Sequence, residues 1–330
     1  MLILVVASCA STGGPTRAQR APRDDSTLRV ELLTAFDLPR EDPRSSELSG
    51  ITWDDANRRL YAVSDSRPLI VPLVPDAEYR TWTMGDPIAV TVPGGWDGEG
   101  IAITPRGFYV SSEIGPHVYE LDRSGALISD VPIPASFGRA LHNRSLESLS
   151  LTPDGAFLFT ANETALEGDG PQPTAAAGTM VRIFRRELAT SQDAEFAYRT
   201  DPVFAPGTGG EMGVAEVCAL SKSEVLVLER SYVRGVGNAV RLYRARLEGA
   251  NVLGTGSIVD ARPVAKSLVV DFGSMPAARI GAATHLPNYE GLALGPARPD
   301  GDRLLFVISD DNGLRELVTR ILVLSLRRGT

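Results

Sequence analysis

The stretch Glu99–Glu113 reads EGIAITPRGFYVSSE. It holds a short run with isoleucine at alternate positions, a Pro-Arg-Gly turn, and a second apolar run that ends in a glutamate. Alternating apolar residues on either side of a Pro/Gly turn are typical of two antiparallel β-strands. The stretch therefore predicts a β-hairpin with a carboxylate at the start of its first strand and another at the end of its second.

The same pattern recurs along the chain, five times in all. The glutamates that open the units are Glu47, Glu99, Glu147, Glu216 and Glu290. The acids that end the second strands are Asp65, Glu113, Glu163, Glu229 and Asp310. The opening glutamates are 52, 48, 69 and 74 residues apart, which is the length of four strands plus loops. The longer steps carry insertions such as 164–178 and 249–264.

This repeat predicts an all-β fold, a β-propeller with five blades by count, over a single domain of residues 28–330. The last unit has one further clear strand, around Ile321–Leu326, and an unassigned strand at 27–36 precedes the first unit. Pairing of these terminal strands would complete the final blade and close the ring. A sixth, irregular blade within 164–210 or 249–285 stays open at this stage.

The N-terminal run MLILVVASCA is similar to a bacterial lipoprotein signal with its lipobox. This pattern predicts a signal segment at 1–9 with Cys9 as the lipidated residue, followed by a flexible tether at 10–27. The alternative is a chance cysteine in an apolar run. On the lipoprotein reading, the body lies at the periplasmic face of the cell envelope, anchored to the outer membrane, or is secreted. No later stretch has 18 uninterrupted apolar residues, so we expect membrane contact only through the lipid.

Composition narrows the classes of partner and of chemistry. The net charge of -8 and the pI near 5.1 argue against nucleic acid as a partner. The sequence contains no Cys/His spacing typical of zinc, no HExxH motif, no Walker A motif and no GxSxG motif. The missing GxSxG motif argues against a serine nucleophile elbow. We expect a monomer that acts on a small molecule.

The repeated acids are predicted to meet at one mouth of the central channel. In an antiparallel hairpin the start of the first strand neighbours the end of the second, and all blades of a propeller share one orientation. The expected pairs are Glu47–Asp65, Glu99–Glu113, Glu147–Glu163, Glu216–Glu229 and Glu290–Asp310. Two carboxylates about 4 Å apart repel by roughly 4 kcal/mol at an effective dielectric near 20. The ring therefore needs bound cations, buried arginines or raised pKa values.

Calcium is the cation that such a ring predicts, because hard oxygen ligands without His or Cys favour it over zinc or copper. The candidate metal ligands are Glu47, Glu99, Glu147, Glu216, Glu290, Glu113, Glu163 and Glu229. The alternative is that the acids cap strands or form ion pairs with Arg67, Arg144, Arg230 or Arg315.

Several units also resemble a known family. The segments ELSGITWD, YAVSDS, NRSLESLSLTPDG, NYEGLAL and VISDDNG are similar to the bacterial "esterase-like activity of phytase" family, and the likeness spans about residues 45–327. Ser148 and the segment AEVCAL depart from the family pattern. The resemblance implies hydrolysis of an ester or phosphoester. It also implies a channel-facing set of residues: Glu99, Glu147, Glu290, Glu229 with Arg230, Asn143 with Arg144, Asp310, Asp311 and Asn312.

The leading functional hypothesis is a calcium-dependent ester or phosphoester hydrolase. Calcium would polarise the substrate oxygen, Asp65 or Asp310 would position or deprotonate water, and Arg144 and Arg230 would hold the anionic group. Two alternatives stay open. One is a non-catalytic, lipid-anchored propeller that binds an envelope ligand or partner, and the other is a lactonase-like propeller enzyme.

Overall fold

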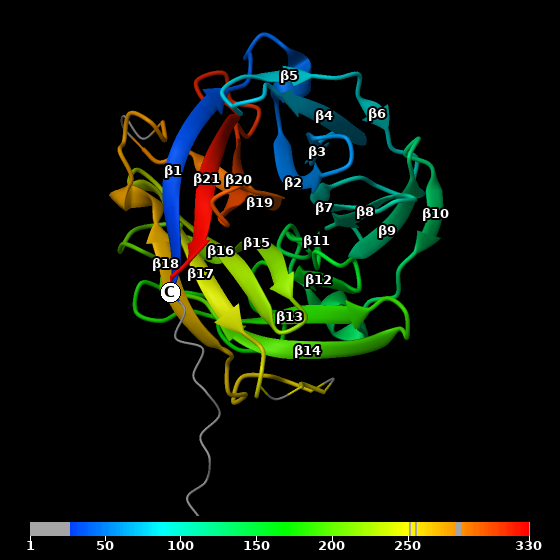
Figure 1. Cartoon of the computed structure of the whole chain (residues 1–330). Helices are drawn as coiled ribbons and strands as arrows, with labels where there is room; N and C mark the ends of the chain where they lie inside the picture. Colours follow the sequence, from blue (N-terminus) through cyan, green and yellow to red (C-terminus); the bar gives the residue numbers. More distant parts are fainter. Residues whose placement is uncertain (1–26, 251, 255, 282–284, 330) are drawn as a thin grey trace, which may run out of the picture.

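The computed structural model describes residues 27–250, 252–254, 256–281 and 285–329. It contains five antiparallel sheets arranged around a common centre, which is a five-bladed β-propeller (Figure 1). Blade 1 comprises β2 (Leu48–Asp54), β3 (Arg59–Ser64), β4 (Leu69–Pro75) and β5 (Trp82–Met84), with β6 (Ile88–Ala89) also paired to β4. Blade 2 comprises β7 (Gly98–Ile103), β8 (Gly107–Ser112), β9 (His117–Asp122) and β10 (Leu127–Asp130).

The other three blades have four strands each. Blade 3 comprises β11 (Ser150–Leu151), β12 (Phe157–Ala161), β13 (Met180–Glu187) and β14 (Gln192–Arg199). Blade 4 comprises β15 (Glu211–Ser221), β16 (Glu224–Val233), β17 (Gly237–Arg246) and β18 (Ala265–Asp271). Blade 5 comprises β19 (Asn288–Ala297), β20 (Arg303–Asp310), β21 (Arg320–Arg328) and the N-terminal β1 (Leu28–Asp37).

The innermost strand of each blade packs against the innermost strands of its two neighbours. These contacts run β2 to β7, β7 to β11, β11 to β15, β15 to β19, and β19 back to β2. The ring is thus complete with five blades, and the described parts of 164–178 and 249–264 are loops between strands of blades 3 and 4.

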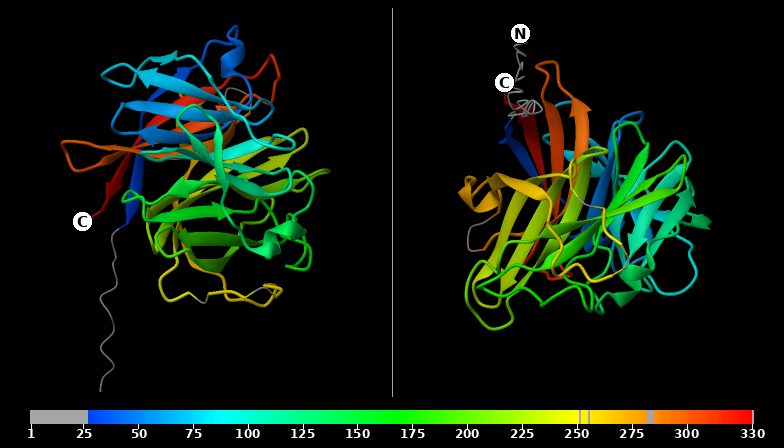
Figure 2. Two further views of the ribbon diagram at one scale, coloured as in Figure 1. Left: turned by 90° about the vertical axis from the view of Figure 1, so that its right-hand side faces the viewer. Right: turned by 90° about the horizontal axis from the view of Figure 1, so that it is seen from below.

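The ring closes through both ends of the chain, as the sequence predicts. β1 pairs antiparallel with β21 from Leu28 opposite Arg328 to Asp37 opposite Arg320. The blue and red strands lie side by side in every view (Figures 1 and 2). Blade 5 therefore takes its outer strand from the N-terminus and its three inner strands from the C-terminus.

The hydrophobic core is divided into layers between consecutive blades. β16 shows how the sequence produces them. Leu226 and Leu228 pack toward blade 5, while Val225 and Val227 pack toward blade 3. Successive strand residues point to opposite faces, and both faces of this blade are covered, so the run Val225–Leu228 is apolar without interruption.

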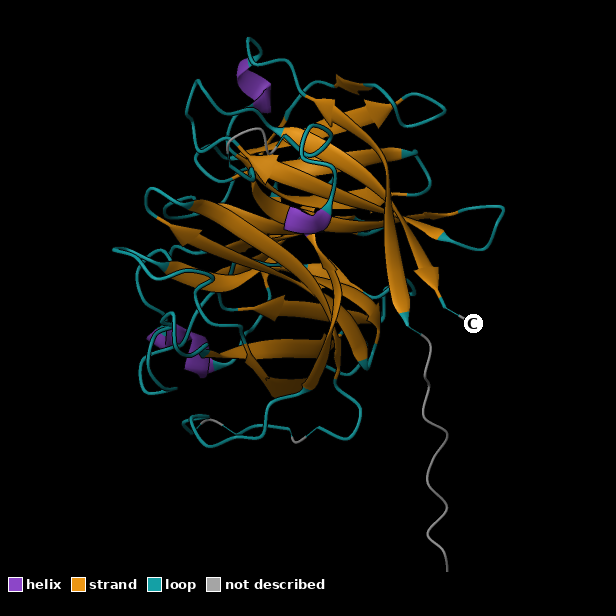
Figure 3. Cartoon of the chain, turned by 90° about the vertical axis from the view of Figure 1, so that its left-hand side faces the viewer, coloured by secondary structure: helices purple, strands orange, loops and turns teal. Residues whose placement is uncertain are grey.

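In the described residues, helix is confined to three short 3₁₀ turns, drawn in purple where they are visible in Figure 3. They span Pro43–Ser45, Ala135–Arg139 and Phe272–Ser274. None of the helices in the described residues has the length and apolarity needed to cross a bilayer. The predicted lipid site Cys9 and the predicted tether, apart from Thr27, lie outside the described residues.

Candidate metal centre at one mouth of the channel

The inner strands bring their first residues very close together at one end of the channel. A Cβ on Gly100 would lie 2.3 Å from the backbone nitrogen of Leu149, and one on Gly291 would lie 2.4 Å from the carbonyl oxygen of Ser49. Only glycine fits at such backbone approaches. Glu99 and Glu290 precede these glycines, and each lies where the strand register shifts. A bulge of this kind re-aims a side chain, here into the channel mouth.

Four acids of blades 2 and 3 form a compact group, which we call the acidic cluster: Asp97, Glu99, Glu113 and Glu147. One carboxylate oxygen from each of Asp97, Glu99 and Glu113 lies within 4.8 Å of the other two. The carboxyl groups of Asp97 and Glu99 are in hydrogen-bond contact, as are those of Glu113 and Glu147. The three glutamates are each less than 9% exposed.

The acidic cluster has no directly paired countercharge among the described residues, although the charge of Arg230 interacts with Glu147 and that of His142 with Asp97. In the part of the chain that the structure describes, no Lys or Arg forms an ion pair with any of its four members. Their neutral donors include the Ser49 hydroxyl, 2.6 Å from Oε2 of Glu99, and the Ser145 amide, which donates to Glu113. Each pair of ionised carboxylates at 4.8 Å would repel by about 3 kcal/mol at an effective dielectric near 20. The cluster therefore needs protons or a cation.

The pKa values of all four cluster members are raised, as expected for buried and half-buried carboxylates without ion-pair partners. Burial, with further repulsion from neighbouring carboxylates, raises the pKa of Glu99 and of Glu147 well above the usual range. Burial likewise raises the pKa of Glu113 to about 7 and moves that of Asp97 upward. A carboxyl group held in this way binds either a proton or a metal ion near neutral pH.

A second group of acids lies at the junction of blades 5 and 1. Burial and the nearby Glu47 and Glu290 raise the pKa of Asp65 to about 6. Burial and the charges of Glu290 and Asp65 raise the pKa of Asp310 well above its ordinary value. Glu47 lies farther out, where its Oε2 accepts a hydrogen bond of 2.6 Å from the Ser66 hydroxyl.

Two arginines compensate part of the ring. Arg230 contacts Glu163 at 3.5 Å and Glu290 at 3.3 Å. Arg144 contacts the same Glu163 at 3.5 Å and Glu211 at 2.9 Å. Glu163 and Glu290 therefore form the ion pairs that were the predicted alternative to metal binding. The members of the acidic cluster form no such ion pair in the described residues.

The structure corrects the predicted pairing of Glu216 with Glu229. In blade 4, Val214 lies opposite Glu229 and Glu216 lies opposite Leu228, so the bulge falls on Ala215. In blade 5, Tyr289 lies opposite Ser309 and the bulge falls on Glu290. The residue equivalent to Glu290 is therefore Ala215. A shift of one residue turns a strand side chain to the other face.

Both blade 4 glutamates consequently have other partners. Oε1 of Glu216 accepts hydrogen bonds from the amides of Leu149 at 3.1 Å and Val217 at 2.9 Å. Glu229 accepts from the Tyr198 hydroxyl at 2.6 Å and from Lys266 Nζ at 2.5 Å. Neither side chain joins the acidic cluster.

Asp97 is the cluster member that sequence reasoning missed. Asp97 can be recognised by comparing the strand registers of blades 1 and 2. Leu48 lies opposite Ser64 in blade 1, and Gly98 lies opposite Ser112 in blade 2, so Leu48 and Gly98 are equivalent. Glu47 is thus the counterpart of Asp97, and Ser49 is the counterpart of Glu99. Aligning the first two units on Gly50 and Gly100 would have shown that the acid at 97 belongs to the repeat.

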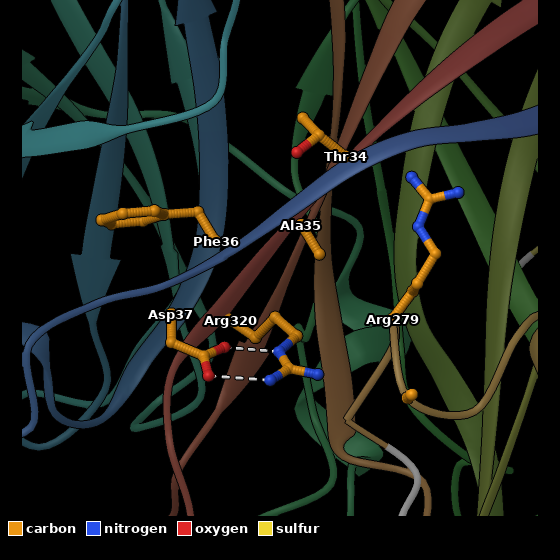
Figure 4. Close-up of a pocket in the computed structure, with 7 residues that line it drawn as sticks. Thr34, Ala35, Phe36, Asp37, Arg279 and Arg320 are labelled. Atoms are coloured by element: carbon orange, nitrogen blue, oxygen red, sulfur yellow. Dashed lines mark hydrogen bonds and ion pairs between the residues drawn. The ribbon is translucent and has the colours of Figure 1, made fainter.

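Two pockets lie away from this mouth. A cavity of about 450 Å³ at the opposite end of the inner strands has Ile51, Ile101, Leu149, Leu292 and the buried free thiol of Cys218 among its lining residues. Figure 4 shows a pocket of about 330 Å³ on the outer strands β1 and β21, beside the Asp37–Arg320 ion pair. Neither pocket is lined by a member of the acidic cluster.

Comparisons with known proteins place the chain in a family. Among curated proteins, none matches this chain. Among solved structures, an endo-arabinase from Bacteroides thetaiotaomicron is 12% identical, with coverage of 88% of this chain and 97% of that chain and a TM-score of 0.49. A PQQ-bound aldose sugar dehydrogenase from Streptomyces coelicolor is 15% identical, with coverage of 91% and 99% and a TM-score of 0.41. A family model described as phytase-like, "esterase-like activity of phytase", matches residues 43–313, and the chain belongs to that family.

Proposed function

We propose that this protein is a calcium-dependent hydrolase of a small anionic ester or phosphoester, with its reaction centre at the acidic mouth of the channel. The observation that carries the proposal is the meeting of three carboxylates within 4.8 Å, two of them buried and that of Asp97 half-buried, with no ion pair to offset them among the described residues. The family description adds support for ester chemistry.

The acidic cluster has the donor chemistry and the size of a calcium site. Calcium takes six to eight oxygen ligands at roughly 2.3–2.6 Å, so two oxygens on opposite sides of one ion lie about 4.8 Å apart. Asp97, Glu99 and Glu113 meet that limit, and Glu147, whose carboxyl group contacts that of Glu113, is a further oxygen donor. A bound calcium would offset the carboxylate charge and polarise an ester or phosphoester oxygen.

Asp65 is our candidate for the group that accepts a proton from water. It belongs to the same mouth, is half-buried, and has a pKa raised to about 6 by burial and neighbouring acids. A general base works best when its pKa lies near the working pH. Asp310, the other predicted candidate, is more deeply buried, and burial with the charges of Glu290 and Asp65 raises its own pKa well above the ordinary value.

Arg144 is our candidate for binding the anionic group of the substrate. Its side chain is 29% exposed and its partner Glu211 is 42% exposed, so one of its two ion pairs is open to exchange with an incoming anion. A guanidinium binds carboxylate or phosphate through a planar fork of donors. Arg230, at 16% exposed, is more enclosed, so Arg144 is the more accessible of the two arginines predicted to hold the anion.

Turnover assays test the proposal. The substrates are p-nitrophenyl phosphate, phytate and p-nitrophenyl acetate, each with calcium and with chelator. We expect hydrolysis that chelator abolishes and that Glu113→Gln reduces at least 100-fold, while the surface control Glu78→Gln keeps full activity. Equal turnover in chelator would overturn the calcium dependence. Calcium binding without turnover on a broad ester panel would indicate the non-catalytic propeller, and turnover of lactones alone would indicate the lactonase-like enzyme.

The proposal includes attachment to the cell envelope through Cys9, which rests on the sequence alone. Metabolic labelling with an alkyne analogue of palmitate tests it. The natural chain should take up the label and fractionate with membranes, and Cys9→Ala should lose both properties. Unchanged labelling of Cys9→Ala would exclude this anchor.

A further inference from the structure

Arg230 occupies a position that every other blade fills with an acid. It lies opposite Gly213, just before the bulge at Ala215, as Asp310 lies opposite Asn288, just before the bulge at Glu290. The corresponding residues of blades 1, 2 and 3 follow just after their second strands and are Asp65, Glu113 and Glu163. Blade 4 therefore replaces an acid by a base at one point of the ring and, at Ala215, removes the second acid.

The contacts of Arg230 join the two blades on either side of its own. Its Nη2 contacts Glu163 of blade 3 at 3.5 Å and Glu290 of blade 5 at 3.3 Å. The side chain is only 16% exposed, and Nε is buried without a hydrogen-bond partner. The nearby charges of Glu147 and Glu211 act on it as well. A guanidinium stays charged at every physiological pH, so this positive charge is permanent.

We infer that Arg230 is an internal counter-ion that stands in for a calcium ion between Glu163 and Glu290. The positive charge of Arg230 prevents a second calcium ion from binding between Glu163 and Glu290. The acidic cluster is then the described part of the mouth that requires a bound cation. This inference builds on the proposed calcium site. Without Arg230, Glu290 would lose its arginine partner and Glu163 would keep only Arg144, so two buried carboxylates would share one countercharge fewer.

Calcium stoichiometry tests the inference by isothermal titration and equilibrium dialysis. We expect Arg230→Gln to bind one calcium more than the natural chain. The matched control Arg230→Lys keeps the charge and should bind the natural number. In chelator, Arg230→Gln should melt at a lower temperature than Arg230→Lys, and calcium should restore it. The double variant Arg230→Gln/Glu290→Gln removes one charge of each sign, folds without the excess repulsion, and should return to the natural number.

The outcomes separate this inference from the proposed function. An unchanged calcium number in Arg230→Gln would overturn the inference, as would identical behaviour of Arg230→Gln and Arg230→Lys. If the natural chain binds no calcium but Arg230→Gln binds one, the proposed function fails while the counter-ion role stands. If neither binds calcium, both fail.

Discussion

Replacing Glu99 by glutamine should uncouple the stability of the protein from calcium while leaving the fold intact. Glutamine keeps the size of the side chain, and its amide oxygen can still accept the hydrogen bond from the Ser49 hydroxyl. The substitution removes one of three charges that lie within 4.8 Å of one another. Because each ionised pair would repel by about 3 kcal/mol, the calcium-free variant should be more stable than the natural chain.

The size of the calcium effect follows from binding linkage. At a calcium concentration 100 times the Kd, binding to the folded state adds about 2.7 kcal/mol to the free energy of unfolding. A domain of about 300 residues has an unfolding entropy of about 0.6 kcal/mol per kelvin, so the melting temperature should rise by about 4 °C. If Glu99→Gln weakens binding 100-fold, the gain falls to about 0.4 kcal/mol and the shift to less than 1 °C.

Differential scanning calorimetry in chelator and in calcium measures the calcium-induced shift in melting temperature of the natural chain and of Glu99→Gln. The control is Glu78→Gln, an exposed glutamate on blade 1, which should keep the natural shift. The reasoning is refuted if Glu99→Gln retains the full calcium shift, or if the natural chain shows no shift at any calcium concentration.

Further predictions concern pH, substrate and core. Folding raises the pKa of Glu113 to about 7, so the contribution of Glu113 to the stability of the calcium-free protein should be greatest below pH 4.5 and fall by up to about 3 kcal/mol as pH rises to 7, seen as the difference between the natural chain and Glu113→Gln in urea unfolding across pH. The kcat/KM should rise with pH around 6 as Asp65 ionises, and Asp65→Asn should reduce it at least 100-fold at pH 7. Arg144→Gln should raise KM for an anionic ester at least tenfold more than for a neutral one; equal increases would contradict its role. Leu324→Ala, in the fully buried middle of β21, should cost 2–5 kcal/mol by urea unfolding.

The fold could be predicted because its signals are local and repeated. Each hairpin carries its own alternation and turn, and the unpaired strands at the two ends of the chain leave one another as natural partners. The repeat count gives five blades, and the structure confirms five. The sixth blade left open at 164–210 or 249–285 is absent from the described residues, since the insertions there are loops.

The site could be predicted only in part, because the position of a bulge is not written in a hydrophobic pattern. The run VAEVCALS is apolar on both sides of its glutamate, since both faces of blade 4 are buried, so alternation does not fix its register. Matching Glu216 to Glu290 by residue type put the fourth unit one place out. Because of this one-residue error, the sequence alone did not identify Ala215 as the equivalent of Glu290. It also placed Arg230 beside the ring of acids, whereas Arg230 occupies one of the ring positions.

The sequence also could not show which acids of the ring form ion pairs with arginine and which do not. Nothing local distinguishes Glu163, which meets two arginines, from Glu113, which meets none among the described residues. The difference depends on which side chains three separate blades bring to one point, and pairwise distances across blades emerge only from the closed ring.

A crystal structure grown with calcium, with anomalous data collected to locate the ion, tests the central claim most directly. We predict an anomalous peak about 2.3–2.6 Å from carboxylate oxygens of Asp97, Glu99 and Glu113. A mouth without such a peak at millimolar calcium, or an ion held only by other acids, would contradict the account.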